Sequence, residues 1–346
     1  MRILESSIYI EDLKKAASAA DLGFLNGKKL LITGGTGLIG SAVVDLILMN
    51  NEVNSAGTVI YVASRDEVKV TERFGGSEYV KWLYYDALEP ISFDVPVDYI
   101  IHCAGNASPE LYVNKAVETM LMNFEGINNL LSYAKDREVS GVLYLSSSEV
   151  YGVKETSKPY KETDYGFVDL LKVRSSYSNS KRAAETLCCS YAEEYGVRTM
   201  IARPGHIFGP GASVKDRRVS SFFPYEVARG KSLILTSSGS QIRSNMYSID
   251  CAVALLTILG KGNSGEAYNV CGKETTSIRE MAAIVTKAAG TSLSYQEPTE
   301  EERAQDNPMN NSSLVGEKLF ALGFEPCFTT EEGLAHTVQI LREAIG

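Results

Sequence analysis

Tyr177 and Lys181 stand four positions apart in residues 177–196, whose pattern predicts a long helix. Side chains at this spacing share one face, with their Cβ atoms roughly 5–6 Å apart. A phenol has an unperturbed pKa of about 10, which is too high for a base at neutral pH. A nearby ammonium stabilises the phenolate, so Tyr177 could remove a proton from a hydroxyl group. The same spacing also occurs in ordinary surface pairs, so further groups are needed.

Such groups follow the apolar segment 141–145, which reads as a strand. Three serines come directly after it, and Glu149 follows them. A serine hydroxyl at this strand end, which we assign to Ser147, can hydrogen-bond the oxygen that reacts. Glu149 is either an acid that acts on the substrate or a solvated loop carboxylate. Together with Tyr177 and Lys181, these residues predict a site that oxidises a carbon bearing a hydroxyl group.

A glycine-rich turn predicts where the oxidant would bind. Gly34, Gly37 and Gly40 follow the spacing GxxGxxG between a predicted strand and a predicted helix. Glycine allows a sharp turn and a close approach to a pyrophosphate, while the helix N-terminus supplies free N–H groups. In this strand–turn–helix setting the pattern predicts a nicotinamide dinucleotide site. The expected contacts of the turn are Gly34, Thr36, Gly37, Leu38, Ile39 and Gly40.

The end of the second predicted strand, 58–65, usually contacts the adenosine ribose. An acid there binds a free 2′-hydroxyl, whereas arginine suits a 2′-phosphate. Ser64 and Arg65 stand at this place and favour NADP. In the alternative, Arg65 is an exposed side chain and Asp66 or backbone groups serve NAD. Asp86 ends the third predicted strand, where it either meets the adenine amino group or caps a helix.

The elements that position these residues alternate along the chain from Lys29 onward. Apolar strands separated by helices indicate an α/β fold with a doubly wound parallel sheet, the Rossmann arrangement. Such sheets bind ligands beyond the carboxyl ends of their strands. We expect a helical lead-in over 1–28, a dinucleotide-binding domain over 29–208 and a smaller α/β substrate lobe over 209–346. Strands could cross between the last two.

Composition excludes several classes of protein. The 346 residues include 34 Lys and Arg against 43 Asp and Glu, a formal net charge of -9, so a general nucleic-acid binder is not expected. The 6 Cys include no CxxC pair and the 3 His are scattered, so no metal site is expected. We find no secretory leader and no apolar run of membrane-spanning length. We therefore expect a cytoplasmic protein without a membrane contact.

Six motifs in order resemble the extended short-chain dehydrogenases/reductases of the nucleotide-sugar epimerase/dehydratase type. They are the glycine turn, His102-Cys103-Ala104-Gly105, Asn123 in MLMNFEGINNLL, SSSEVYG, Tyr177-x-x-x-Lys181 and ARPGHIFGPG. This resemblance runs from about Lys29 to the end of the chain. It implies cofactor contacts at Ala87, Ala104, Asn123, Tyr177, Lys181 and Pro204. It also implies a homodimer formed by the helices around 114–136 and 177–195.

Within that family, the chain looks most like the UDP-glucuronate decarboxylases. The matching positions are Ser147, Glu149, Arg174, Tyr177, Lys181 and Arg243. The resemblance implies that Tyr177 deprotonates the sugar 4-hydroxyl while hydride passes to the nicotinamide, and that the resulting 4-keto sugar loses carbon dioxide. Glu149 would orient the sugar or a water. The expected substrate contacts are Ser148, Arg174, His206, Arg218 and Arg243.

Other readings stay open. A GDP-mannose type 4,6-dehydratase fits Ser147-Ser148-Glu149 and Ser64-Arg65, whereas the dTDP-glucose type has Asp at the place of Ser148. A 4-epimerase needs no glutamate at this place. A nicotinamide-binding regulator is the alternative from another class, although such proteins often lose the Tyr/Lys pair. Two departures from the decarboxylases are Ser64-Arg65 in place of an acid and His206 in place of the usual Asn.

Overall fold

A computed structural model describes residues 3–106, 109–297 and 311–345. Its centre is one parallel sheet of seven strands in the order β11-β6-β5-β4-β1-β2-β3. The strands are β1 (Lys29–Thr33), β2 (Val59–Ser64), β3 (Val80–Tyr84), β4 (Tyr99–His102), β5 (Gly141–Leu145), β6 (Thr199–Pro204) and β11 (Glu266–Val270). The predicted doubly wound α/β fold is confirmed.

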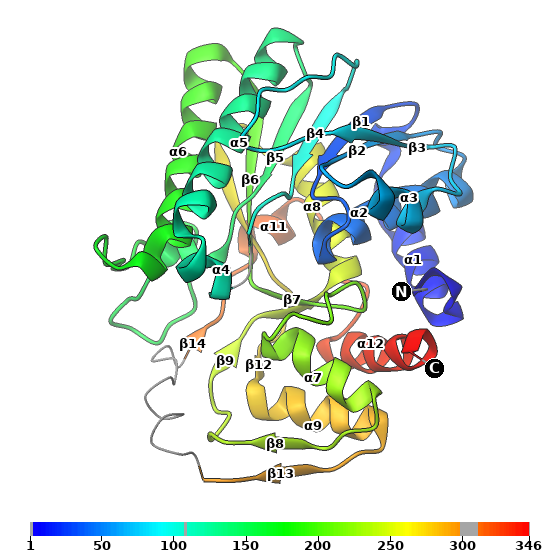
Figure 1. The fold of residues 1–346 in the computed structure, drawn as a ribbon, viewed down its shortest axis with the longest axis vertical. Helices are drawn as coiled ribbons and strands as arrows, with labels where there is room; N and C mark the ends of the chain where they lie inside the picture. Colours follow the sequence, from blue (N-terminus) through cyan, green and yellow to red (C-terminus); the bar gives the residue numbers. More distant parts are fainter. Residues whose placement is uncertain (1–2, 107–108, 298–310, 346) are drawn as a thin grey trace.

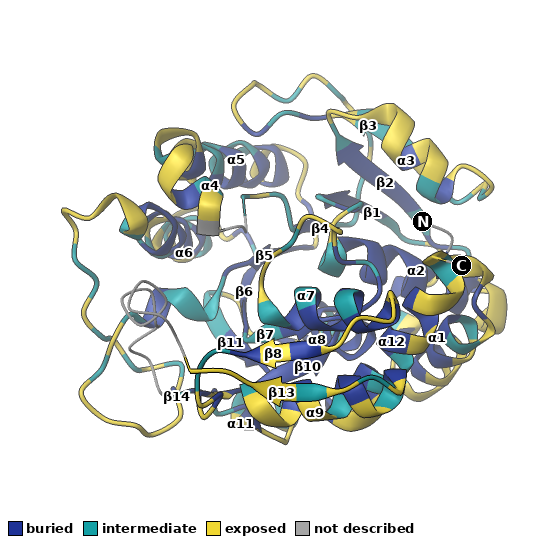
Figure 2. Cartoon of the chain, turned by 60° about the horizontal axis from the view of Figure 1, so that its bottom comes forward, coloured by how far each residue is buried: buried dark blue, intermediate teal, exposed yellow. Residues whose placement is uncertain are grey.

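Helices cover both faces of this sheet, as Figures 1 and 2 show. On one face α5 (Ala116–Asp136) packs against α6 (Ser176–Tyr195), and on the other α2 (Leu38–Asn54) packs against α8 (Ser248–Lys261). Successive strand residues point to opposite faces, so Leu30 and Ile32 of β1 join the core under α2 while Leu31 joins the core under α5. The strands are buried on both sides, which fits their apolar sequences.

The N-terminal segment wraps the α2 face. It contains η1 (Ile3–Glu5), α1 (Ser7–Ala19) and η2 (Gly23–Leu25). Ser6 caps α1, and Tyr9, Leu13, Ala16 and Ala17 form its buried stripe. The Tyr9 hydroxyl donates to Asp45 of α2 over 2.8 Å. The lead-in is therefore helical and packed onto the sheet domain.

The chain forms its second lobe beyond the carboxyl end of β6 (Figure 1). Among the residues that the structure describes, the helices of the lobe are α7 (Val219–Ala228), α9 (Ile278–Ala289), α11 (Glu317–Ala321) and the terminal α12 (Thr330–Ile345). Its small strands pair in groups: β7 (His206–Phe208) with β10 (Asn245–Tyr247), β9 (Ile242–Arg243) with β12 (Thr276–Ser277) and β14 (Asn311–Ser312), and β8 (Leu233–Leu235) with β13 (Leu293–Tyr295).

After residue 208 the chain returns to the central sheet, where β11 adds the last strand and α8 covers one face. Nearly every residue of α8 is buried between α2 and the sheet, and β11 pairs with β6 in parallel register. Between the strands lie α3 (Glu67–Phe74), α4 (Pro109–Asn114), η3 (Ser148–Tyr151) and η4 (Val173–Ser175). No helix among the described residues is long and apolar enough to cross a membrane.

Candidate active site

The glycine turn leaves a helix N-terminus open to a ligand. Gly34 has a φ of 67°, and a Cβ at Gly40 would lie 2.3 Å from the Gly34 carbonyl oxygen, so the helix start packs directly on the turn. Gly37 caps α2 without a side-chain hydrogen bond. The first N–H groups of α2 and its dipole therefore favour an anion here.

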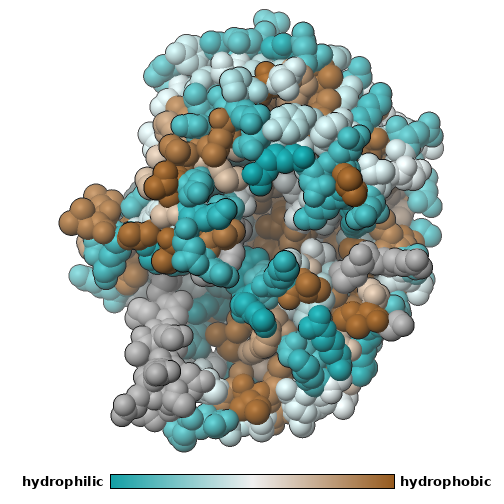
Figure 3. All heavy atoms as spheres, viewed as in Figure 1, coloured by the Kyte–Doolittle hydropathy of each residue, from teal (hydrophilic) through white to brown (hydrophobic). Residues whose placement is uncertain are grey.

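A cleft of about 470 Å³ opens in front of this turn. Thr36, Gly37 and Leu38 line one side, and Asp216 and Arg218 of the second lobe line the other. Thr36, Leu38 and Ile39 are half-buried and Gly37 is exposed. The cleft lies between the two lobes, where Figure 3 shows the molecule hollowed. These features fit the pyrophosphate of a dinucleotide.

The end of β2 presents cationic and hydroxyl groups. Arg65 is 66% exposed at its side chain and lies 3.5 Å from an Asp86 carboxylate oxygen. The Ser64 hydroxyl accepts the Asp66 N–H over 3.0 Å, and Asp66 caps α3 by accepting the Lys69 N–H. Asp86 accepts the Leu88 N–H in its own turn. The carboxylates near this strand end are thus engaged, and Arg65 is the exposed cation that pairs with Asp86.

Beyond β4, Asn123 and Gly105 lie close to Lys181. Asn123 is fully buried, donates to Ser180 over 3.0 Å, and its side-chain oxygen has no partner among the described residues. A Cβ at Gly105 would come within 3.0 Å of that oxygen and 3.9 Å of the Lys181 Nζ. Ala104 is half-buried, while Ala87 and Pro204 are buried. The arrangement forms the floor of the expected nicotinamide end.

Tyr177 and Ser147 are brought together, as expected. Tyr177 is 6% exposed, and Ser147 lies close enough to its phenol to lower its pKa. Ser147 also caps η3 by accepting the Glu149 N–H over 3.2 Å. The strand end and the start of α6 therefore meet at one phenolic oxygen, where a substrate hydroxyl would be held.

Lys181 lies beside the Tyr177 ring. Its ammonium lies 5.8 Å from the centre of the Tyr177 ring and donates to the Leu145 carbonyl over 2.7 Å. Burial raises the pKa of Tyr177 to about 12, Glu149 adds to the rise, and Ser147, Arg218 and Tyr112 oppose it. Burial lowers the pKa of Lys181 to about 8. Desolvation of the buried phenol thus opposes its ionisation.

A second cleft, of about 360 Å³, adjoins Tyr177 and would hold the sugar. It is lined by Ser148, Glu149, Arg174, Ser178, His206 and Arg243, with apolar residues of the segment 152–168. Arg174 donates to both carboxylate oxygens of Glu149 over 3.0 Å each, and Ser178 donates to the same carboxylate over 3.3 Å. Four of the five predicted substrate residues therefore line one cavity, whereas Arg218 lines the cleft in front of the glycine turn.

The lobe residues approach this cavity from the other side. His206 begins β7, and burial lowers its pKa to about 4 with help from Arg243 and Arg218, so the ring is neutral at pH 7. Its Nδ1 atom is buried without a hydrogen-bond partner among the described residues. Arg218 is held by Asp216 over 2.5 Å and lies close enough to Tyr177 to influence its pKa. Arg243 is buried.

Sequence reasoning missed a buried ion pair beneath the site. Glu185 and Arg203 are 9% and 6% exposed at their side chains and form two hydrogen bonds, of 2.9 and 2.7 Å. Ser146 donates to Glu185 over 2.5 Å. Glu185 lies one turn after Lys181, so the pair fixes α6 to the strand end beside Ser147. An arginine in the otherwise apolar segment of β6 was the available signal for a buried partner.

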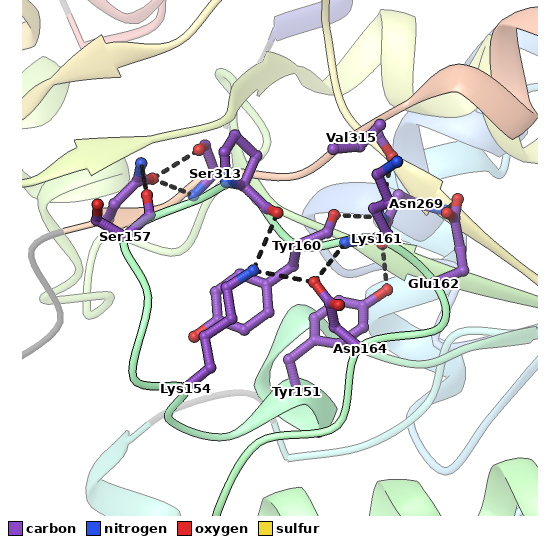
Figure 4. A network of polar contacts seen from close by, with 12 residues as sticks. Tyr151, Lys154, Ser157, Tyr160, Lys161, Glu162, Asp164, Asn269, Ser313 and Val315 are labelled. Carbon is purple, nitrogen blue, oxygen red and sulfur yellow. Dashed lines mark hydrogen bonds and ion pairs between the residues drawn. The ribbon is translucent and has the colours of Figure 1, made fainter.

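A polar network holds the loop that follows η3 (Figure 4). Tyr151 donates to the Asn269 side-chain oxygen over 2.5 Å, and the Asn269 amide donates to the carbonyl groups of Tyr160 and Val315 over 3.0 Å each. Arg203 also donates to the Tyr151 hydroxyl over 3.1 Å. The network links the sugar cleft to β11 and to the segment before α11. Loop residues 152–168 are thereby fixed as a wall of the cleft.

Comparison with known proteins identifies the family of the chain. The sequence model of the "NAD dependent epimerase/dehydratase family" matches residues 30–271. The chain belongs to the NAD-dependent epimerase/dehydratase family. UDP-glucuronic acid decarboxylase 1 from Xenopus tropicalis is 31% identical over 318 residues, covering 92% of this chain and 73% of that protein. UDP-glucuronic acid decarboxylase 6 from Arabidopsis thaliana is 32% identical over 325 residues, covering 93% and 91%.

Solved structures of family members share the fold. An epimerase from Methanothermobacter thermautotrophicus superposes with a TM-score of 0.80 at 22% identity, covering 94% of this chain and 95% of that one. The dTDP-glucose 4,6-dehydratase DesIV from Streptomyces venezuelae, solved with NAD bound, gives 0.74 at 23% identity, covering 91% and 97%. The predicted membership of this enzyme family is confirmed. No group of three or more residues among those described could hold a metal ion.

Proposed function

We propose that this enzyme decarboxylates UDP-glucuronate after oxidising the sugar at carbon 4. The observation that carries the proposal is the Arg174–Glu149 pair beside Tyr177. Both guanidinium hydrogen bonds measure 3.0 Å, and Arg174 lines the cavity expected to hold the sugar. The planar donors of a guanidinium suit a carboxylate, and binding the sugar carboxylate would take Arg174 from Glu149. The named decarboxylase relatives support the same substrate.

A nicotinamide dinucleotide at the glycine turn would supply an acceptor for the carbon-4 hydride and later return it. Tyr177 would remove the proton of the 4-hydroxyl, and Ser147 would donate to the reacting oxygen. The resulting ketone lies beta to the carboxylate, so carbon dioxide leaves and the bonding electrons form an enolate. Ser147 and the protonated Tyr177 then hydrogen-bond the enolate oxygen. Glu149 would orient the water that protonates carbon 5.

We propose NADP as the preferred cofactor because Arg65 is the exposed cation at the β2 end. Asp86 and Asp66 already accept N–H groups, and Ser64 offers only a hydroxyl to the ribose. Titration with NAD and NADP tests this. Arg65→Ala should lower affinity for NADP at least tenfold, about 1.4 kcal/mol, and leave NAD nearly unchanged. Equal affinities of the unaltered enzyme for both cofactors would refute the preference.

We also propose a homodimer formed through α5 and α6. Val117, Met120, Leu121 and Phe124 of α5 are each at least 41% exposed, which is unusual for a row of large apolar side chains. Sedimentation of Leu121→Glu beside the unaltered enzyme tests the interface. We expect the unaltered enzyme at twice the chain mass and the variant at the chain mass. A monomeric unaltered enzyme would refute the proposal.

The substrate is tested by incubating the enzyme with a panel of nucleotide sugars and measuring product masses. Loss of one carbon dioxide from UDP-glucuronate is the expected result. Loss of one water from a hexose nucleotide would replace decarboxylation by dehydration, and an unchanged mass with an inverted carbon 4 would replace it by epimerisation. Arg174→Lys is the matched variant, since it keeps a positive charge without the planar fork. We expect its KM for UDP-glucuronate to rise at least tenfold.

A further inference from the structure

The lead-in helix α1 contacts both lobes of the molecule, although no motif assigns it a function. The family model begins at residue 30, after α1 has ended. In the structure α1 packs against α2 and α8 of the sheet domain and against α12 of the second lobe. Figure 1 shows α1 and α12 near the two ends of the chain. The helix therefore bridges the two halves of the molecule that enclose the substrate site.

Two buried side chains of α1, three residues apart, make polar contacts across this bridge. Tyr9 is 1% exposed and donates to Asp45 of α2 over 2.8 Å. Asp12 is 4% exposed and binds the second lobe instead. It accepts the Tyr247 hydroxyl over 3.1 Å, and the His336 Nδ1 atom lies 3.0 Å from both of its oxygens. Because a buried carboxylate is costly without partners, these contacts hold α1 to the lobe.

Tyr247 connects Asp12 to the wall of the sugar cleft. It ends β10, and β10 pairs in parallel with β7, which begins at His206. The His206 N–H donates to the Ser244 carbonyl over 2.9 Å. Arg243 lies four residues before Tyr247 in the same segment, and both Arg243 and His206 line the sugar cleft. The segment that Asp12 anchors therefore carries one cleft residue and pairs with the other.

The Tyr247 ring is packed independently of its hydroxyl. It stacks on Phe208 of β7 with 5.9 Å between the ring centres, and it meets the edge of Phe328 at 5.4 Å. A Cβ at Gly333 would lie 2.9 Å from the Tyr247 Cβ, so α12 packs directly on this side chain. Removal of the hydroxyl alone should therefore leave the ring in place and break only the link to α1.

We propose that Asp12 is a positioning residue for the substrate, which acts through Tyr247 to hold β7 and β10 where His206 and Arg243 bind the nucleotide sugar. The lead-in helix is then a strut between the sheet domain and the second lobe. Asp12 does not line the sugar cleft, so it acts only through these strands. The inference rests on the proposed function and adds a role for a segment that precedes the family match.

The test measures substrate affinity and turnover separately in Tyr247→Phe, which keeps the ring and removes the hydroxyl. With the enzyme saturated with cofactor, we expect the KM for UDP-glucuronate and the Kd for UDP, measured by calorimetry, to rise about tenfold. A lost hydrogen bond to a charged group is of this size. The value of kcat should stay within about twofold, because Ser147, Tyr177 and Lys181 belong to the sheet domain. Asp12→Asn should raise KM and Kd in the same direction.

Tyr133→Phe is the matched control. It also removes one buried tyrosine hydroxyl, which donates to the Val95 carbonyl over 2.6 Å within the sheet domain. Its KM and its affinity for UDP should equal those of the unaltered enzyme.

An unchanged KM in either folded variant, or a fall in kcat alone, would overturn the assignment, since a loss of stability lowers the amount of active enzyme and not its affinity. If Tyr247→Phe does not fold, Asp12→Asn gives the same decision. Absence of UDP-glucuronate turnover by the unaltered enzyme would refute the proposed function and this role with it. Turnover by the unaltered enzyme with an unchanged KM in the variants would refute only the role of Asp12.

Discussion

Replacing Arg203 by Met should destabilise the fold strongly, because it leaves the buried Glu185 carboxylate without its ion-pair partner. Arg203 makes two hydrogen bonds to Glu185, one to Tyr151 and one to the Glu162 carbonyl, all between 2.7 and 3.1 Å. Removing one member of such a pair costs about 3–5 kcal/mol. For a chain of this length that corresponds to a fall in Tm of about 4–7 °C.

The double variant Arg203→Met/Glu185→Leu gives the sharper result. Replacing both charges by apolar groups of similar size is often neutral or stabilising. We therefore expect the double variant to recover more than half of the unfolding free energy that Arg203→Met loses. Arg137→Met is the matched control, since Arg137 also holds a carboxylate, Asp94, with two hydrogen bonds but at the surface. It should leave the unfolding midpoint unchanged within error.

Unfolding by urea and by heat, with activity as a check on the folded state, measures these differences. A single variant as stable as the unaltered protein would show that the Glu185 carboxylate does not depend on Arg203. A double variant less stable than Arg203→Met would show that the Glu185 carboxylate stabilises the fold even without Arg203, more than the apolar packing that replaces it. Either result would contradict the reasoning from desolvation.

Three further perturbations test other parts of the site. Tyr177→Phe should lower turnover by about 10²–10⁴-fold while cofactor affinity, measured by calorimetry, stays within about threefold; retained turnover would remove the assigned base. Gly40→Ala should weaken cofactor binding at least tenfold, about 1.4 kcal/mol, because its Cβ would lie 2.3 Å from the Gly34 carbonyl oxygen. A Cβ at Gly76 would have no atom within 4 Å, so the control variant Gly76→Ala should bind the cofactor as the unaltered enzyme does. Lys181→Met should be more stable than the parent at neutral pH. Burial lowers the pKa of the Lys181 ammonium to about 8. Between about pH 8 and 10.5 the folded state therefore holds fewer protons than the unfolded state. The unaltered protein consequently gains stability as the pH rises through this window. The stability difference measured by urea unfolding should therefore shrink toward pH 10.5; a difference independent of pH would contradict the desolvation argument.

Features that depend only on residues close together in the sequence could be predicted from local patterns. The glycine turn, the apolar strands and the Tyr177–Lys181 spacing depend on neighbours close in sequence, and each lies where the pattern indicated. The carboxyl ends of parallel strands meet at one edge, so Ser147 could be assigned to the same side as the turn. The short strands after Gly209 could not be predicted in this way, because a strand of two or three residues is too short to show a hydrophobic periodicity.

Contacts between distant segments could not be read in this way. Tyr112 meets Tyr177 across 65 positions, and only the packing of α4 against α6 brings the rings together. The direction of the Lys181 ammonium is set by the Leu145 carbonyl, a backbone group that no side-chain pattern reports. The expectation that Lys181 would acidify Tyr177 stays a prediction, since spacing on a helix fixes the face and not the hydrogen-bond partner.

In the proposed reaction, Tyr177 takes the proton of the 4-hydroxyl while the hydrogen on carbon 4 departs. Single-turnover reaction of the cofactor-loaded enzyme with UDP-glucuronate deuterated at carbon 4, followed by nicotinamide fluorescence, tests it directly. We expect cofactor reduction before carbon dioxide release, slowed by the deuterium, and no reduction in Tyr177→Phe. Carbon dioxide release at an unchanged rate without cofactor reduction would contradict the account.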